Sequence, residues 1–232
     1  TPKPSSAASD VYKRQTIVVN FFLAFMLVYA SDWTNENNFG LLHLFNSSTL
    51  LSIIIGVLLL DLVGAYLPHL VQHKVKLLWY IHIVHHTDQK VDTTTANRHH
   101  PFESIVRFVF TLAGIFISGA PIGLVLMYQS LSVIFSQFNH ANIQISDKVD
   151  KGLSYLIVSP NMHKVHHHFE LPYTDSNYGN IFSLWDRLFG TYMELSKSEI
   201  IYGVDTDLDE IKNSKFNSLI ERPFKKWYNH FN

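Results

Sequence analysis

The sequence predicts an all-α integral membrane protein with about four transmembrane helices and a histidine-rich helical cap. Long uncharged stretches support this prediction, as does a composition of 47% hydrophobic and only 16% charged residues. The third observation is histidine: all but His43 and His230 of the 14 histidines lie between His69 and His168. A soluble protein with buried helices is the alternative, because the mean hydropathy is only +0.07.

The composition excludes several classes of function. The 18 Lys and Arg residues are balanced by 19 Asp and Glu residues. We therefore expect no nucleic acid as a partner, since phosphate binding requires an excess of cationic side chains. The chain contains no cysteine, which excludes disulfides, thiolate zinc sites, iron–sulfur clusters and cysteine nucleophiles.

The apolar pattern sets the expected elements along the chain. Residues 1–15 are polar and are interpreted as a non-native or disordered tail, residues 16–195 as one membrane domain, and residues 196–232 as a polar C-terminal tail. Thr16–Ala30 and Gly40–Leu60 carry no formal charge and predict the first two spans.

The last two spans are expected in a single uncharged stretch. It runs from Phe108 to Ser146 and, as a helix, would be roughly twice as long as a bilayer core of about 30 Å. The sequence Gly119-Ala120-Pro121 predicts the turn that divides it into two helices.

Basic residues predict the topology. The loop between the first two spans contains Asp32 and Glu36 but no Lys or Arg, whereas the segments after the second and fourth spans are basic. The positive-inside rule then places these two segments, and nearly all of the histidines, on the cytoplasmic face. The expected membrane is the endoplasmic reticulum in a eukaryote or the inner membrane in a bacterium.

The histidine spacing is typical of metal ligands. His69 and His73 are four residues apart, so a helix presents both on one face. The pattern His-x-x-His-His occurs twice, at His82, His85 and His86 and again at His163, His166 and His167, and His140 ends the fourth predicted span. So many imidazoles exceed what one tetrahedral zinc uses, which favours two metal ions among iron, zinc, copper and nickel.

In this order the motifs resemble the histidine boxes of the fatty acid hydroxylase superfamily, which includes the sterol desaturases. The resemblance runs from about Leu58 to Tyr192 and includes LLWYIHIVHHTD, TANRHHPFE, FNHAN, SPNMHKVHHH and DSNYGNIFSLWDRLFGTY. It implies a di-metal site in the cap, with ligands His69, His73, His82, His85, His86, His140, His163, His166 and His167. His100 is a further candidate ligand, whereas His99 and His168 are expected not to bind metal.

The resemblance implies an enzyme in which two iron ions per chain activate O2. The enzyme would hydroxylate or desaturate an unactivated C–H bond of a lipid such as a sterol or a fatty acyl chain. Each turnover requires two electrons. Because the chain shows no glycine-rich phosphate-binding fingerprint, we expect a separate electron donor, such as a b-type cytochrome or a ferredoxin system. The alternative is a non-catalytic, histidine-rich membrane protein that binds or transports metal.

Polar residues near the histidines are candidates for orienting the ligands through hydrogen bonds, because ligating imidazoles donate their second N–H to an oxygen. Two positions depart from the pattern of many relatives, which have Arg where this chain has Leu70 and Ile83. Pro68 is expected to bend the helix that presents His69. The candidate orienting residues are Asp61, Asp88, Arg98, Glu103, Asn142, Asp175, Asn177 and Asp186.

Overall fold

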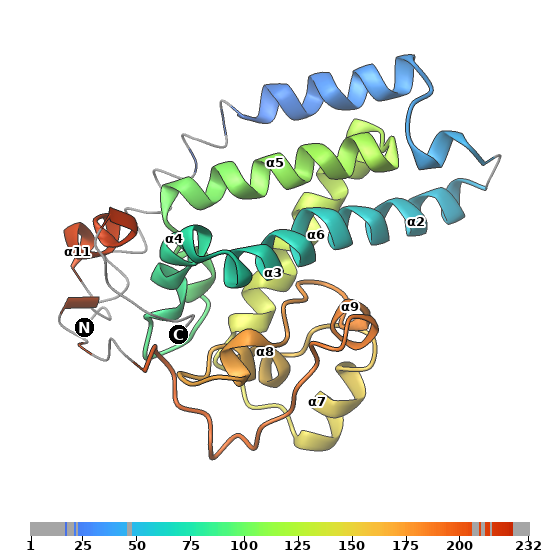
Figure 1. The fold of residues 1–232 in the computed structure, drawn as a ribbon. Coiled ribbons are helices and arrows are strands. Elements are labelled where there is room, and N and C mark those ends of the chain that lie inside the picture. Colours follow the sequence, from blue (N-terminus) through green and yellow to red (C-terminus); the bar gives the residue numbers. More distant parts are fainter. Residues whose placement is uncertain are drawn as a thin grey trace.

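The described chain is built from helices and loops (Figure 1). The computed structural model describes residues 17, 21, 23–45, 48–205, 209, 212–213 and 215–224. Within these residues there is no β-strand, only isolated bridges between Ile157 and Phe182 and between His168 and Tyr202. The predicted all-α class is therefore confirmed for the described part of the chain.

Within the described part of the chain, three helices are long and apolar enough to cross a membrane: Thr49–Lys74, α5 (Pro101–Ser118) and α6 (Ile122–His140). A further helix covers residues 23–36. The first predicted span, Thr16–Ala30, lies partly outside the described residues, so the number of four spans stays a prediction.

The second predicted span begins later than expected and continues further. The helix α2 (Thr49–Asp61) starts after Ser48, whose hydroxyl accepts a hydrogen bond from the Leu51 N–H at 3.4 Å. A π-helical turn, Leu62–Tyr66, joins α2 to α3 (Leu67–Lys74). Pro68 has no N–H to donate to the preceding turn, and the widened π turn accommodates it within one continuous helix.

The turn between α5 and α6 lies where the sequence predicts it. Gly119 ends α5 in the left-handed conformation, with φ of 70°, and Pro121 precedes α6. The turn packs against Gly40, whose φ is 107°, and against Ser31, whose hydroxyl donates to the Ala120 carbonyl at 2.8 Å.

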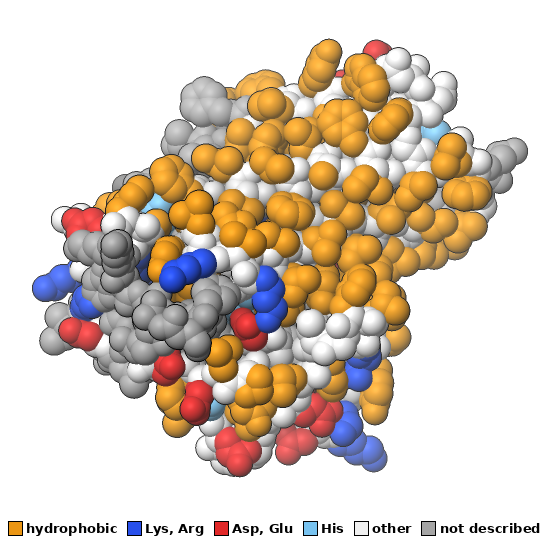
Figure 2. Space-filling model, viewed as in Figure 1, with side chains coloured by type: hydrophobic (Ala, Val, Ile, Leu, Met, Phe, Trp, Pro, Cys, Tyr) orange, Lys and Arg blue, Asp and Glu red, His pale blue; other side chains and the backbone are white. Residues whose placement is uncertain are grey.

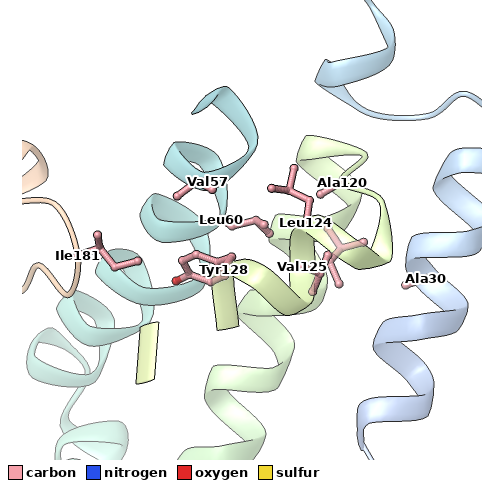
Figure 3. Close-up of a cluster of buried hydrophobic side chains, with 9 residues drawn as sticks. Ala30, Val57, Leu60, Ala120, Leu124, Val125, Tyr128 and Ile181 are labelled. Carbon is pink, nitrogen blue, oxygen red and sulfur yellow. The ribbon is translucent and has the colours of Figure 1, made fainter. Parts of the chain in front are cut away.

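The largest apolar core joins the long helices (Figure 3). Leu60 of α2, Ile115 of α5, and Val125 and Tyr128 of α6 are almost fully buried against one another. Ala30 from the helix over 23–36 belongs to the same cluster. Burial of this surface fixes the relative positions of the helices that carry the histidines.

Short helices pack at one end of the long ones, in what we call the short-helix region. It comprises α4 (Lys76–His86), which packs against α3 and α5, and α8 (Pro160–His166), which packs against α6. It also contains α7 (Asp147–Leu153), α9 (Leu184–Leu188) and α11 (Phe216–Ile220). Apolar side chains gather over the long helices and charged side chains mostly over this region (Figure 2). Its location on the cytoplasmic face stays a prediction.

A buried carboxylate anchors the short-helix region to the long helices. Asp61, at the end of α2, accepts hydrogen bonds from the indole N–H of Trp185 at 2.9 Å and from the backbone N–H groups of Phe182 and Ile181 at 3.2 and 3.4 Å. Asp61 is fully buried, and these donors compensate for its loss of water.

The close approach of Gly40 to Gly119 generates a stability prediction. A methyl group at Gly40 would overlap the Gly119 backbone, and the φ of 107° is strained for any other residue. We expect Gly40→Ala to destabilise the protein by about 2 kcal/mol or more and to lower the Tm in detergent. The matched control is Gly123→Ala, because a methyl group there meets no atom within 4 Å. Equal Tm values for the two variants would contradict the prediction.

Candidate metal centre

The nine histidines named as ligands from the sequence gather into two buried groups. In each group, one nitrogen per ring lies within 4.8 Å of the others, close enough to share one metal ion. The five-histidine group comprises His69, His73, His82, His86 and His166, and the four-histidine group comprises His85, His140, His163 and His167.

Helical geometry explains how one motif serves both groups. On α4, His82 and His86 are four residues apart and share a face, whereas the ring planes of the adjacent His85 and His86 are nearly perpendicular, at 89°. His82 and His86 therefore enter the five-histidine group, and His85 enters the other. The second His-x-x-His-His motif divides in the same way, with His166 in the five-histidine group and His163 and His167 in the four-histidine group.

Hydrogen bonds to carbonyl oxygens fix the protonation of several rings. The Nδ1 atoms of His69 and His166 lie 2.8 and 2.6 Å from the carbonyl oxygens of Tyr178 and Ser176. A carbonyl oxygen only accepts, so each Nδ1 carries the hydrogen and each Nε2 presents a lone pair. Both Nε2 atoms are buried and have no hydrogen-bond partner among the residues that the structure describes, which suits nitrogens that ligate a metal ion.

The four-histidine group gives the sharpest test of whether an ion fits. His85 and His140 also donate from Nδ1 to carbonyl oxygens, those of Thr95 and Ser136, at 3.1 and 2.7 Å. Their Nε2 atoms are therefore both acceptors, yet they lie 3.1 Å apart. Two lone pairs at this distance repel unless a cation lies between them.

The remaining distances in this group suit the same cation. The Nε2 atom of His140 lies 3.0 Å from that of His163 and 3.1 Å from that of His167. Nitrogens bound to one ion at about 2.1 Å lie roughly 3.0 to 3.4 Å apart. These residues therefore fit a shared metal ion.

Burial keeps these rings in the neutral form. Loss of water, reinforced by neighbouring imidazoles, lowers the pKa of His85, His86, His166 and His167 well below the ordinary value of 6.5. Neutral imidazole is the form that binds metal, so no proton has to be displaced from these nitrogens at neutral pH.

Two predicted carboxylates contact histidines directly. One oxygen of Glu103, which is fully buried, lies 3.1 Å from Nδ1 of His82, and the other lies 2.9 Å from Nδ1 of His99. Asp175 lies 3.3 Å from Nδ1 of His73 and accepts from Lys74 at 2.6 Å. Each carboxylate accepts from Nδ1 and so orients its ring with Nε2 toward the histidine group.

Other predicted orienting residues act through the loop that supplies the carbonyl oxygens. Asn177, between Ser176 and Tyr178, bonds to the Met162 carbonyl and to both backbone groups of Met193. Asp186 accepts from the backbone N–H groups of Tyr178 and Gly179 at 2.7 and 2.9 Å. Asp61 holds the following residues of the same loop.

Asp88 and Arg98 contact the surroundings of α4. Asp88 accepts a hydrogen bond from the Thr95 hydroxyl at 2.7 Å, and the Thr95 carbonyl in turn accepts one from Nδ1 of His85. Arg98 donates to the carbonyl oxygens of Val84 and Asn213 and so ties α4 to the C-terminal residues.

Three further residues lie away from both histidine groups: the candidate ligand His100, the candidate orienting residue Asn142, and His168, which was expected not to bind metal. His100 caps α5 by accepting from the Phe102 N–H, and its Nε2 lies 3.2 Å from the Ile220 carbonyl. Asn142 is exposed. His168 accepts from the Ile201 N–H at 3.1 Å. None of the three belongs to a described histidine group.

The backbone acceptors were not identified from the sequence. Four carbonyl oxygens each accept a hydrogen bond from the Nδ1 of a histidine, namely those of Thr95, Ser136, Ser176 and Tyr178. A carbonyl is present at every residue, so no residue type marks these four. The only signal is indirect: Asn177, in the Asp-Ser-Asn-Tyr-Gly stretch, and Asp186, which follows it, both hold the loop.

The site and fold define a class of protein: a helical, histidine-rich protein with three helices that suit a membrane. The profile of the fatty acid hydroxylase family matches residues 53–191, more than half of the chain, and the chain belongs to this family. The predicted family resemblance is thus confirmed.

The relatives are proteins that modify lipids. An ornithine lipid hydroxylase, OlsE, of Rhizobium tropici is 24% identical over 60% of this chain and 41% of its own. An alkylglycerol monooxygenase of Danio rerio is 30% identical over 61% of this chain and 30% of its own. The chain thus spans less than half the length of these relatives. No solved structure gives a significant match.

The lowered pKa values predict how stability depends on pH. Below about pH 6.5 these histidines are protonated in the unfolded chain but stay neutral in the folded protein. The free energy of unfolding therefore falls as the pH falls, by up to about 1.4 kcal/mol per pH unit for each such histidine. We expect the Tm of chelator-treated protein to fall steadily between pH 7.5 and pH 5. Replacing His166 by Gln should make this dependence shallower. A Tm that is constant over this range would contradict the prediction.

Proposed function

We propose that the chain is a non-haem di-iron lipid oxygenase, with one iron ion in each histidine group. The observation that carries this proposal is the convergence of unprotonated, buried nitrogens in two adjacent groups at the end of apolar helices. Imidazole ligands suit iron. The five rings of the larger group exceed the three or four protein ligands that a zinc site usually takes.

The proposed reaction is hydroxylation of a lipid. One C–H bond, O2, two electrons and two protons would give one C–OH group and one water molecule. When bound, the iron ions would supply the activation of O2. The names of the relatives favour hydroxylation of a polar lipid, and desaturation is the second outcome such a site allows. The electrons would come from a separate donor, such as a b-type cytochrome or a ferredoxin system.

The side chains of this protein would hold, orient and shield the ions. Hydrogen bonds from Nδ1 to carbonyl oxygens keep the rings of His69, His85, His140 and His166 in one tautomer and orientation. Burial of the groups excludes water, which would otherwise compete for the ions. We place the site on the cytoplasmic face, as the basic residues predict.

The division into two groups predicts separate losses of metal. Because His166 and His167 belong to different groups, His166→Ala and His167→Ala should each reduce the iron content of the purified protein from two ions to one. The double variant should bind none. The matched control is His168→Ala, which alters the neighbouring buried histidine and should retain both ions. Elemental analysis of detergent-purified protein measures this, and an unchanged iron content in the double variant would overturn the proposal.

Glu103 provides a second test. Replacement of Glu103 by Leu removes the acceptor of His82, which should weaken metal binding by the five-histidine group about 10- to 100-fold. Competition with a chelator measures the affinity. The control is Glu194→Gln, since this exposed carboxylate contacts Lys151 and the Tyr192 hydroxyl and belongs to neither histidine group. An unchanged affinity in Glu103→Leu would show that the carboxylate has no role in holding the ligands.

The reaction itself is tested in cells supplied with 18O2. Expression of the wild-type chain should produce a lipid that carries one 18O atom, whereas the His166→Ala, His167→Ala variant should not. Metal without any oxidised lipid would favour the alternative of a non-catalytic metal-binding protein.

A further inference from the structure

A cavity of about 610 Å³ lies between the first described helix, α5 and α6. Its volume is within the range of roughly 300–1,000 Å³ that is usual for ligand sites. Leu126 and Val133 of α6 line it and are also exposed, at 59% and 60%. Within the described part of the chain, the cavity can therefore be reached from the side of the membrane-suited helices.

One end of the cavity lies next to the histidine groups, with His99 between them. His99 lines it, and its ring stacks on that of His85 with 4.5 Å between centroids and 18° between planes. Nδ1 of His99 lies 2.9 Å from Glu103, which also contacts His82. A single ring thus separates the cavity from both groups.

The lining combines polar and apolar side chains along the helices. Near the histidines it includes Ser104 and Arg107 of α5 and Gln137 of α6. Gln137 is about 5 Å along the helix axis from His140, whereas Leu126 is about 21 Å away, at about 1.5 Å per residue. Leu126 therefore marks the end of the α6 lining that is far from the metal centre, and Leu27 of the first described helix adds a further apolar side chain to the cavity.

Arg107 is the sole Lys, Arg, Asp or Glu residue among the described residues that line the cavity. Its side chain is 43% exposed, and its nearest carboxylate is Glu103, at 3.9 Å. That distance is longer than a hydrogen bond, and the Glu103 oxygens already face His82 and His99 at 3.1 and 2.9 Å. The charge on Arg107 is therefore only partly compensated within a helix that suits a membrane, where such a charge requires a partner.

We propose that this cavity binds the lipid substrate and that Arg107 selects a lipid with an oxyanion head group, a phosphate or a carboxylate. A guanidinium group donates two parallel hydrogen bonds to such a group. The chain of the lipid would extend toward Leu27 and Leu126. The carbons nearest the head group then lie nearest the histidines. That the bound lipid is a substrate rests on the proposed function, whereas its binding in the cavity does not.

The test compares lipids that share one chain and differ in the head group. Wild-type protein in detergent is titrated with hexadecyl phosphate, palmitate and hexadecanol, and bound lipid is counted by native mass spectrometry. We expect at least one of the two anions to bind about tenfold more tightly than the alcohol, as a charge-assisted hydrogen bond provides. Arg107→Gln should remove this preference without changing the affinity for hexadecanol.

Two further variants control the test. Val133→Trp should weaken binding of all three lipids, because the indole would occupy the cavity. Lys148→Gln removes an exposed cation outside the cavity lining and should change nothing. A preference for anions that survives in Arg107→Gln would overturn the role of Arg107, and unchanged binding in Val133→Trp would overturn the cavity as the lipid site. Iron content, measured on the same samples, reports separately on the proposed function.

Discussion

The structure depends on one interaction: the hydrogen bond from the outer nitrogen of a buried histidine to a fixed oxygen. This bond places the hydrogen on Nδ1 and leaves Nε2 as a lone pair that faces other lone pairs. The Nε2 atoms of rings held in this way cannot donate hydrogen bonds to one another, so the interior suits a cation. Much of the surrounding architecture serves to hold the acceptor oxygens, because a carbonyl that moved would release its ring.

The loop from Ser176 to Trp185 shows how this requirement is met. Two of its carbonyl oxygens accept hydrogen bonds from His69 and His166. The side chains of Asn177 and Asp186 fix its backbone through further hydrogen bonds. Asp61 holds its far end from the apolar helix. Burial raises the pKa of Asp186 to about 6. The backbone N–H groups that donate hydrogen bonds to Asp186 oppose this rise, because they stabilise the charged carboxylate. Carboxylates thus occupy apolar surroundings here because they organise backbone rather than because they bind metal.

The sequence was sufficient to predict the all-α class and the turn at Gly119–Pro121, which follow from apolar patterning and the Gly-Ala-Pro break. The nine histidines that gather were predicted from their spacing together with the family resemblance. Assignment of His85 and His86 to different groups required the orientation of α4 relative to α3 and α8. The π turn before Pro68 could not be predicted, since local propensity does not distinguish a bent helix from a widened one. The cavity is lined by three helices whose packing depends on long-range contacts such as those of Leu60 and Val125.

The order in which the chain is made gives the loop a consequence for biosynthesis. His69 and His166 precede Tyr178 and Ser176 in the sequence, so a growing chain presents all nine histidines before it contains these two acceptors. Asp61 likewise lacks its Trp185 partner until after α6 has been synthesised. The two acceptors can therefore fix these rings only after the whole of α6 and α8 has been synthesised. A chain truncated just after His167 would retain every candidate ligand and still lack the means to hold His69 and His166 in position.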